Sequence, residues 1–485
     1  MSEPIKVLFL AAEAEPFVKI GGLADVAGSL PLALRALPLD VTQGAQLDVR
    51  LVLPMHRTIR AEANTLRAVA DFSVYRRGGA LPAHVFEMFH SGMPVYFISG
   101  EPLASTPSVY SADSEADLNK YTFFSLATLE MIRYLDWQPD IIHANDWHTA
   151  LALYALQSRR TDPMLSRIRT LITVHNLPYM GNDGQKVLSA YGLMPLNDDV
   201  LPNWARNQPL PLGLWAADAI VPVSPTYGRE ILTPEFGCGL ESFLKTRIES
   251  ITGILNGLDC GTWNPETDVA LANRFNVDLL SLRRVNRTAL QKNLGLEERP
   301  APLMAMIGRI NQQKGFDIAF DALRQMEDLD WQFVVLGSGE SELESAARSL
   351  QAYYPDRVRT VLRYDADLSR RIYAGADMFL MPSRYEPCGL AQMIAMRYGC
   401  VPVVHATGGL KDTVHEGKTG FLFQDATPGS MVETLRRAFD VYSNAEKWQQ
   451  FQRNAMLEDF SWEYPARQYA IIYHSLTVSN DGGES

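Results

Sequence analysis

Residues 5–12 read IKVLFLAA and residues 19–26 read KIGGLADV, so a short apolar run is followed by a turn containing a lysine and two glycines. An apolar run without alternation predicts a buried strand, and the apolar periodicity of residues 24–37 predicts a helix after the turn. A strand, a glycine turn and a helix in this order are typical of the opening unit of a doubly wound parallel sheet.

The same pattern continues along the chain in two sets. Further apolar runs in the first half lie at 49–53, 95–98, 140–143, 170–174 and 219–223, with helical patterns at 121–134 and 149–158 between them. A second set of runs lies at 302–307, 331–336, 358–362, 378–381 and 401–404. Short strands that alternate with helices indicate an α/β fold, and the repetition predicts two Rossmann-like domains facing one another.

The domain limits follow from composition. Residues 253–264 are rich in Gly, Asn and Asp, which suits an inter-domain connection, so we place the boundary near Gly253. The sequence predicts a first domain over 1–253 and a second over 254–462. A last helix is expected over 463–478, and the polar residues 479–485 are expected to be a disordered tail.

Charge and cysteine content exclude several classes of protein. The net charge of −12 over 485 residues argues against a surface that grips nucleic acid or an anionic membrane, whereas a neutral polymer is an acceptable partner. The cysteines are sparse and lack C-x-x-C spacing, which favours free thiols in a reducing compartment. The run at 7–12 is too short for a signal peptide, so we expect a soluble, cytoplasmic protein.

Polar residues directly after predicted strands are the candidate site residues of the first half. Lys19, Gly21 and Gly22 form either a phosphate- or sugar-binding turn or a structural Gly-Gly turn. The segment 143–148, HANDWH, has a spacing that fits no standard zinc site and suits sugar hydroxyls and stacking at least as well. His175 follows the strand at 170–174, where a histidine can bond a hydroxyl or stabilise a developing charge, but taken alone it is better explained as a structural histidine at a strand end. The charges between Tyr110 and Lys120 are interpreted as a solvated loop.

The second half contains cations and glycines in the corresponding positions. Arg309 and Lys314 follow the strand at 302–307, where they are either surface cations or a clamp for a diphosphate, and we favour the clamp. Glu386 lies at a strand-to-helix junction, as a helix cap or as a partner of sugar hydroxyls. Residues 407–410, TGGL, make a second glycine turn. No G-x-G-x-x-G follows the first strand, which argues against a dehydrogenase.

Taken together these motifs resemble one family, the bacterial glycogen synthases and plant starch synthases, which are family 5 glycosyltransferases. The segments 19–26 and 383–390 resemble its N-terminal and C-terminal signatures, and several shorter motifs fall between them in the order of the family: 143–148, 173–176, 254–259, 263–265, 308–315 and 407–410. The resemblance runs from Lys6 to about Tyr473. It implies a GT-B fold, in which the two domains face across a deep cleft and a C-terminal helix crosses back to the first domain.

The resemblance also implies an activity and roles for single residues. The chain would transfer glucose from ADP-glucose to the non-reducing 4-hydroxyl of an α-1,4-glucan, glycogen or starch, with retention of configuration and without a metal or other cofactor. The residues expected to act in catalysis are Asp146, His175, Arg309, Lys314 and Glu386, with the two cations on the diphosphate. The residues expected to bind the donor are Lys19, Gly22, Asn256, Tyr364, Cys388, Gly389, Thr407, Gly408 and Gly409, with Tyr364 near the base.

Differences from the family pattern concern the acceptor. Pro178 and Met180 stand where Ala and Gln are usual, Lys120-Tyr121 replaces a common Arg-Phe pair, and the loop between Tyr110 and Lys120 is short. We expect them to affect acceptor preference more than donor chemistry. Two alternatives are a related retaining glucosyltransferase that uses UDP-glucose or another acceptor, and a non-catalytic glucan-binding relative. The non-catalytic alternative is disfavoured because the chain has the residues expected at the donor diphosphate and sugar, Lys19, Arg309, Lys314 and Glu386. No nucleic acid, membrane or protein partner is expected.

Overall fold

The computed structural model describes residues 3–42, 44–59, 65–106 and 108–478, and these form two compact units. The first unit comprises residues 1–257 and 462–485, and the second comprises 258–461. The division therefore falls a few residues after Gly253. Residues 479–485, the expected tail, lie outside the described residues.

The first unit is built on a sheet with the strand order β3-β4-β5-β2-β1-β6-β7-β8 within the described residues. Its strands are β1 (Ile5–Leu10), β2 (Leu47–Pro54), β3 (Arg67–Arg76), β4 (Gly79–His90), β5 (Met93–Gly100), β6 (Ile141–Asn145), β7 (Arg169–Val174) and β8 (Ala219–Pro222). Its helices are α1 (Gly22–Arg35), α2 (Glu101–Ala104), α3 (Ser114–Met131), α4 (Asp146–Gln157), α5 (Gln185–Ala190), α6 (Pro209–Ala216), α7 (Pro225–Glu230), α8 (Glu241–Thr246) and α17 (Glu463–Val478).

Strand β1 lies inside this sheet and pairs in parallel with β2 and with β6. The strands β5, β7 and β8 continue the parallel pairing, as the unbroken apolar runs predict. The strands β3 and β4 were not predicted. They form an antiparallel hairpin at the edge of the sheet, and their partly exposed faces give a mixed polar and apolar sequence rather than an apolar run.

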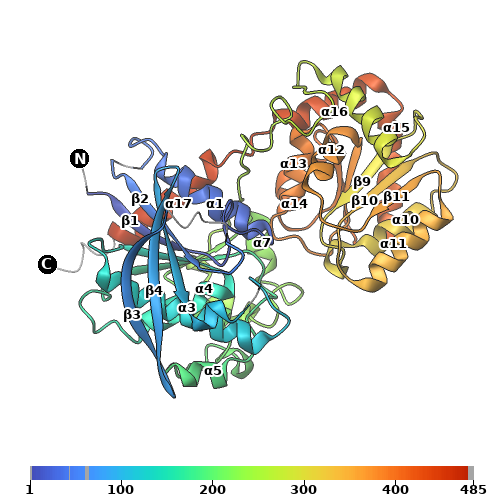
Figure 1. The fold of residues 1–485 in the computed structure, drawn as a ribbon. Helices are drawn as coiled ribbons and strands as arrows, with labels where there is room; N and C mark the ends of the chain where they lie inside the picture. The colour runs from blue at the N-terminus through green and yellow to red at the C-terminus, as the bar shows by residue number, and fades with distance from the viewer. Residues whose placement is uncertain (1–2, 43, 60–64, 107, 479–485) are drawn as a thin grey trace. The chain divides into compact units, whose positions relative to one another are not determined.

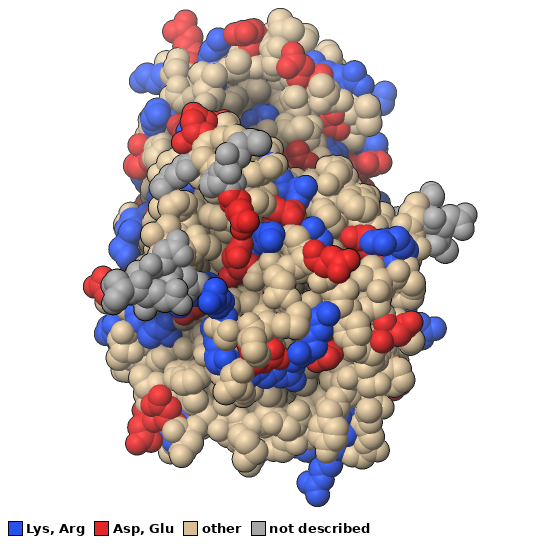
Figure 2. All heavy atoms as spheres, turned by 90° about the vertical axis from the view of Figure 1, so that its left-hand side faces the viewer, with Lys and Arg blue, Asp and Glu red and all other residues tan. Residues whose placement is uncertain are grey.

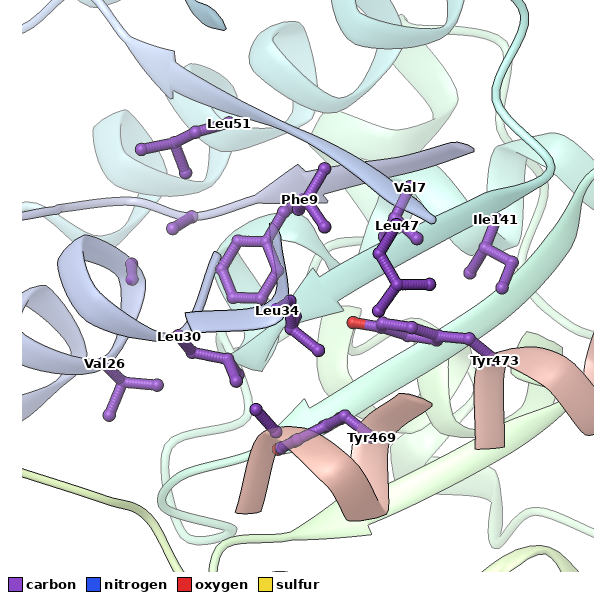
Figure 3. Packing of buried hydrophobic residues seen from close by; sticks show 14 of the residues in the cluster. Val7, Phe9, Val26, Leu30, Leu34, Leu47, Leu51, Ile141, Tyr469 and Tyr473 are labelled. Atoms are coloured by element: carbon purple, nitrogen blue, oxygen red, sulfur yellow. The ribbon is translucent and has the colours of Figure 1, made fainter. Parts of the chain in front are cut away.

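One face of the first sheet is covered by α1 and α17, which contact each other although they are far apart in sequence (Figure 1). Figure 3 shows Tyr469 and Tyr473 of α17 among Phe9, Leu30 and Leu47 in this core. The tyrosine hydroxyls are also satisfied: Tyr473 bonds to His143 Nδ1 at 2.6 Å, and Tyr469 to Thr173 Oγ1 at 3.2 Å. The C-terminal helix is thus part of the core of the first unit.

The second unit is built on a parallel sheet with the order β11-β10-β9-β12-β13-β14 in the described part of the chain, and Figure 1 shows helices on both of its faces. Its strands are β9 (Leu303–Ile307), β10 (Gln332–Leu336), β11 (Val358–Val361), β12 (Met378–Met381), β13 (Val401–His405) and β14 (Phe421–Phe423). Its helices are α9 (Arg283–Leu294), α10 (Phe316–Arg324), α11 (Ser341–Tyr353), α12 (Ala366–Gly375), α13 (Ala391–Arg397), α14 (Gly408–Thr413), α15 (Pro428–Tyr442) and α16 (Ala445–Leu457).

Charged side chains of both signs lie on the part of the surface that Figure 2 shows. On the face shown in Figure 2, basic and acidic side chains are interspersed rather than gathered into a field of one sign. No described helix has the length and apolar character that a bilayer crossing requires.

Candidate active site

Both sheets have a switch point, which is the place where ligands bind in doubly wound folds. In the first sheet β1 lies between β2 and β6, and in the second β9 lies between β10 and β12. Asp146 directly follows β6, Arg309 follows β9, and Glu386 follows β12. In the second unit the sheet order therefore places Arg309 and Glu386, which are distant in sequence, at the carboxyl ends of the neighbouring strands β9 and β12.

In the second unit, Glu386 is the centre of a cluster of polar contacts. Its Oε2 accepts a hydrogen bond from Lys314 Nζ at 2.6 Å and another from Ser383 Oγ at 2.9 Å. Glu386 is buried, while Lys314 is partly exposed. The structure thus joins two predicted site residues from the loops after β9 and β12, and it adds Ser383, which the prediction of single residues omitted.

The glycines at the start of α14 lie against the backbone of the same loop. Gly409 N donates to the carbonyl oxygen of Glu386 at 3.0 Å. A Cβ on Gly408, whose φ is +44°, would lie 1.9 Å from that same oxygen, and a Cβ on Gly409 would lie 2.1 Å from the Cys388 carbonyl oxygen. Thr407 is the N-cap residue of α14. The predicted TGGL turn is therefore required for close backbone approach to the segment that carries Glu386, Cys388 and Gly389.

A methyl group at position 408 is expected to displace Glu386. In Gly408→Ala we expect a loss of stability of about 1–3 kcal/mol from the clash and a clear fall in turnover, because the carboxylate leaves its place beside Lys314. Thermal unfolding and kcat measure the two effects. Gly417→Ala is the matched control, since Gly417 also has a positive φ of +71° but nothing lies within 4 Å of its added Cβ. Equal losses in the two variants would contradict the explanation by the Glu386 contact.

The loop that carries Arg309 is fixed by backbone hydrogen bonds of the neighbouring residues, and the Arg309 side chain takes no part in them. Gly308 N donates to Leu336 O at 3.1 Å, Ile310 N to Ser338 O at 3.0 Å, and Glu340 N to Ile310 O at 2.7 Å. A Cβ on Gly337 or Gly339 would meet the backbone of the 308–310 loop at about 2 Å, so both glycines are needed. The Arg309 side chain is exposed and has no ion pair with the described residues. It is free to meet an anion.

Tyr364 lies on the loop after β11 and is 82% exposed. This loop belongs to the same end of the sheet as the loops after β9 and β12, because all these strands are parallel. No hydrogen bond or ring contact within the described residues fixes the Tyr364 side chain. Its predicted contact with the nucleotide base stays a prediction.

In the first unit, Asp146 and His175 are brought together from β6 and β7. Asp146 has the left-handed backbone conformation, with φ of +55°, at the start of α4. Its Oδ1 accepts a hydrogen bond from the backbone N–H of His175 at 2.7 Å, and the N–H of Asn176 lies at 3.4 Å. Burial raises the pKa of Asp146 to about 7, against the lowering effect of these two N–H groups.

The raised pKa makes a prediction for stability. Between the ordinary aspartate pKa of about 4 and about 7, folded Asp146 keeps a proton that the unfolded chain releases, so its contribution to stability falls as the pH rises through this window. Asp146→Asn keeps the acceptor oxygen and tolerates positive φ. We expect it to be more stable than the parent at pH 8 by at least about 1 kcal/mol, with the difference shrinking as the pH falls towards about 4.

Urea unfolding at several pH values measures this difference. The exposed Asp40→Asn serves as the control in the same unit and should show no such trend. A pH-independent difference between Asp146→Asn and the parent would contradict the buried, proton-binding carboxyl.

The loop that contains Lys19 binds a carboxylate of the same chain, Glu13, which the sequence did not reveal. Glu13, directly after β1, accepts hydrogen bonds at Oε2 from the N–H groups of Ile20 at 2.5 Å and Gly21 at 3.0 Å, and at Oε1 from Tyr110 Oη at 2.9 Å. Lys19 Nζ bonds to Asp25 at 2.6 Å. Of the two glycine N–H groups expected to meet an anion, that of Gly21 is thus held by Glu13, and Gly22 begins α1.

Two asparagines present buried oxygens without partners. Asn176 Oδ1 and Asn256 Oδ1 are buried and make no hydrogen bond within the described residues. A buried amide oxygen without a partner is costly unless a ligand or water donates to it, so both are suited to a hydroxyl-rich ligand. Asn256 was predicted from the resemblance. Asn176 was seen only as the neighbour of His175.

His143, the first residue of the HANDWH segment, is structural. His143 is fully buried, with Nδ1 on Tyr473 Oη at 2.6 Å and Nε2 on Thr173 Oγ1 at 2.7 Å, so neither nitrogen is available to a ligand. The described residues contain no group of three or more side chains that could hold a metal ion.

The interpretation of the charges before the helix as a solvated loop was wrong for Asp117 and Lys120. Both lie in α3 and are buried, with Lys120 Nζ on Asp117 Oδ1 at 2.7 Å and on the Val109 carbonyl oxygen at 2.6 Å. The reason is that each charge satisfies the other and the lysine also satisfies backbone carbonyls, which sequence spacing does not reveal.

Comparison with known proteins agrees with this architecture. The starch synthase catalytic domain family matches residues 6–246, and the glycosyl transferases group 1 family matches residues 287–455. A glycogen synthase of Desulforudis audaxviator is 37% identical, with 99% of this chain and 98% of that protein covered. One from Anaeromyxobacter sp. is 39% identical, with 98% and 100% covered.

Among solved structures, the catalytic domain of starch synthase IV from Arabidopsis thaliana, bound to ADP and acarbose, is similar with a TM-score of 0.88 and 33% identity. The match covers 98% of this chain and all of that one. A sucrose-phosphate synthase from Thermosynechococcus elongatus, 19% identical with a TM-score of 0.61, shares the fold. Full-length similarity at this identity, together with the two Rossmann-like units, shows that the chain belongs to the glycogen and starch synthase family of GT-B glucosyltransferases.

Proposed function

We propose that this enzyme transfers glucose from ADP-glucose to the non-reducing 4-hydroxyl of an α-1,4-glucan, with retention of the anomeric configuration. The observation that carries the proposal is the ion pair of the buried Glu386 with Lys314, at the switch point of the second sheet and in the loop that also contains Arg309. Family membership over the whole chain, and the starch synthase IV structure bound to ADP and acarbose, support the donor and the acceptor.

Arg309 and Lys314 would bind the diphosphate of the donor. Both follow β9, and the exposed guanidinium of Arg309 suits bidentate contact with phosphate oxygens, while Lys314 supplies a point charge. As the bond between the sugar and the diphosphate breaks, negative charge develops on the leaving phosphate. Two cations in contact with the diphosphate stabilise that charge more than they stabilise the intact donor, which lowers the barrier.

Glu386 would act in charge stabilisation and not as a covalent nucleophile. Its Oε2 is already occupied by Lys314 and Ser383, so the carboxylate is held in place and its charge is partly shared. We propose that it orients Lys314 and stabilises the positive charge that develops on the sugar. The leaving phosphate would deprotonate the incoming 4-hydroxyl on the same face, and the transfer would need no cofactor.

Asp146, His175 and Asn256 would contact the transferred glucose. Asp146 is held by the backbone N–H of His175, and Asn256 Oδ1 is an unpartnered buried acceptor among the described residues. We also propose that the enzyme acts in the cytoplasm, in keeping with four cysteines that are free thiols in the structure.

The test is release of nucleoside diphosphate from ADP-glucose and, in parallel, from UDP-glucose, each with and without glycogen. Glycogen-dependent release of ADP is the expected result. Release from UDP-glucose alone would show that the donor is UDP-glucose rather than ADP-glucose, and the class of reaction would be unchanged. Absence of release from both donors would overturn the proposed function.

A further inference from the structure

Asn145 occupies a position that connects three strands at the switch point of the first sheet. It is the last residue of β6 and is completely buried. Its Nδ2 donates to the carbonyl oxygen of Leu10 in β1 at 2.9 Å, and its Oδ1 lies 2.9 Å from His175 Nε2, just after β7. The backbone of Asn145 is fixed as well, since its N–H donates to Thr149 Oγ1 at 2.6 Å.

These contacts determine the tautomer of His175. A backbone carbonyl can only accept a hydrogen bond, so the amide group that faces Leu10 must be the NH2 and the amide oxygen must face the imidazole. That oxygen has no hydrogen to give, and the His175 nitrogen beside it therefore carries the proton. In a neutral imidazole this leaves Nδ1 unprotonated, as an acceptor only.

His175 Nδ1 has no hydrogen-bonding partner within the described residues, and the side chain is partly exposed. Burial lowers the pKa of His175 to about 3, so the ring stays neutral over the pH range in which such an enzyme works. The titratable groups around it are Asp146 on α4, which binds its backbone N–H, His143 on β6, His148 on α4, and Tyr227 on α7, whose oxygen accepts from Leu177 N.

We propose that Asn145 is a positioning residue that holds His175 in the tautomer with Nε2 protonated, so that Nδ1 accepts a hydrogen bond from a hydroxyl of the bound sugar. The inference rests on the proposed function, because it requires a sugar beside His175. It goes further in assigning the direction of that hydrogen bond and the residue that sets it.

The first test is the ¹⁵N NMR spectrum of protein labelled at histidine, with His175→Gln to assign the signal. The expected spectrum of the parent has a protonated Nε2 and an unprotonated Nδ1 for His175, unchanged between pH 5 and 8. In Asn145→Leu the preference for this tautomer should be lost. A parent spectrum with the proton on Nδ1, or an unchanged tautomer in Asn145→Leu, would overturn the proposal.

The second test is the pH profile of Asn145→Asp. A carboxylate beside Nε2 favours the imidazolium and raises the pKa of His175, and an imidazolium has no acceptor nitrogen. We expect kcat/KM of Asn145→Asp to fall about tenfold for each pH unit below the raised pKa, a dependence that the parent, whose His175 stays neutral, does not show. The dependence should disappear in the double variant Asn145→Asp/His175→Gln.

A purely structural role for Asn145 gives a different result. Both variants would then lose thermal stability and turnover in parallel, at every pH, with no new titration of His175, and this would overturn the proposal. Failure of the parent enzyme to turn over ADP-glucose would contradict the proposed function instead, because the tautomer is measured on the protein without substrate.

Discussion

Replacement of Glu386 by glutamine is expected to lower kcat by about 10²–10³-fold, the range for loss of one preorganised electrostatic group at a reaction centre. The variant keeps the size of the side chain and an oxygen that Ser383 can reach, but it removes the charge that pairs with Lys314 at 2.6 Å. The lysine then loses its orientation, and the sugar loses a nearby negative charge when it becomes positive. KM for the donor should change much less than kcat.

Steady-state kinetics with ADP-glucose and glycogen measure the effect, and calorimetric titration with ADP shows whether the donor site is intact. Glu416→Gln is the matched control, since Glu416 also forms an ion pair in the second unit, with Arg437, but lies away from the carboxyl ends of β9 and β12. If Glu386→Gln retains kcat within about twofold of the parent, the role in charge stabilisation is wrong.

Replacement of Arg309 by alanine is expected to lower kcat/KM for ADP-glucose by about 10²–10³-fold without loss of stability. The catalytic effect follows from the loss of a cation at the leaving diphosphate. Stability should be retained because the side chain is exposed and makes no ion pair with the described residues, whereas the loop around it is held by backbone hydrogen bonds.

Two further variants sharpen this test. Arg309→Lys keeps the charge without the planar fork and should recover only part of the activity. Arg348→Ala removes an exposed arginine of α11 in the same unit and should leave kcat/KM unchanged. An Arg309→Ala enzyme with unchanged affinity for ADP and unchanged kcat/KM would exclude the diphosphate contact.

The parallel strands of both units, apart from the short β14 (Phe421–Phe423), were predicted because each is an unbroken apolar run followed by polar or glycine residues. Every run used for the prediction overlaps a strand, from β1 at Ile5–Leu10 to β13 at Val401–His405. The hairpin of β3 and β4 was missed because both strands are partly exposed and lack such a run. Local pattern therefore predicts buried strands well and partly exposed strands poorly.

The candidate site was predictable in its residue types and less so in its contacts. Lys314 and Glu386 were both named, but their ion pair depends on β9 and β12 being neighbours, and strand order is a tertiary property. Glu13 precedes the lysine-glycine loop by a few residues, yet nothing in its spacing shows that it binds the loop N–H groups. Lys120 and Asp117 are charged, and their burial follows only from their mutual pairing.

The sequence by itself determined the fold class, the family and the chemical types at the ends of the strands, because these depend on periodicity and on motifs in a fixed order. Tertiary structure alone decided which of these groups meet: Lys314 with Glu386, Glu13 with the glycine loop, and Asn145 with His175. The physical reason is that hydrogen bonds and ion pairs act over about 3 Å, and residues distant in the chain reach that separation only when the order and register of the strands are set.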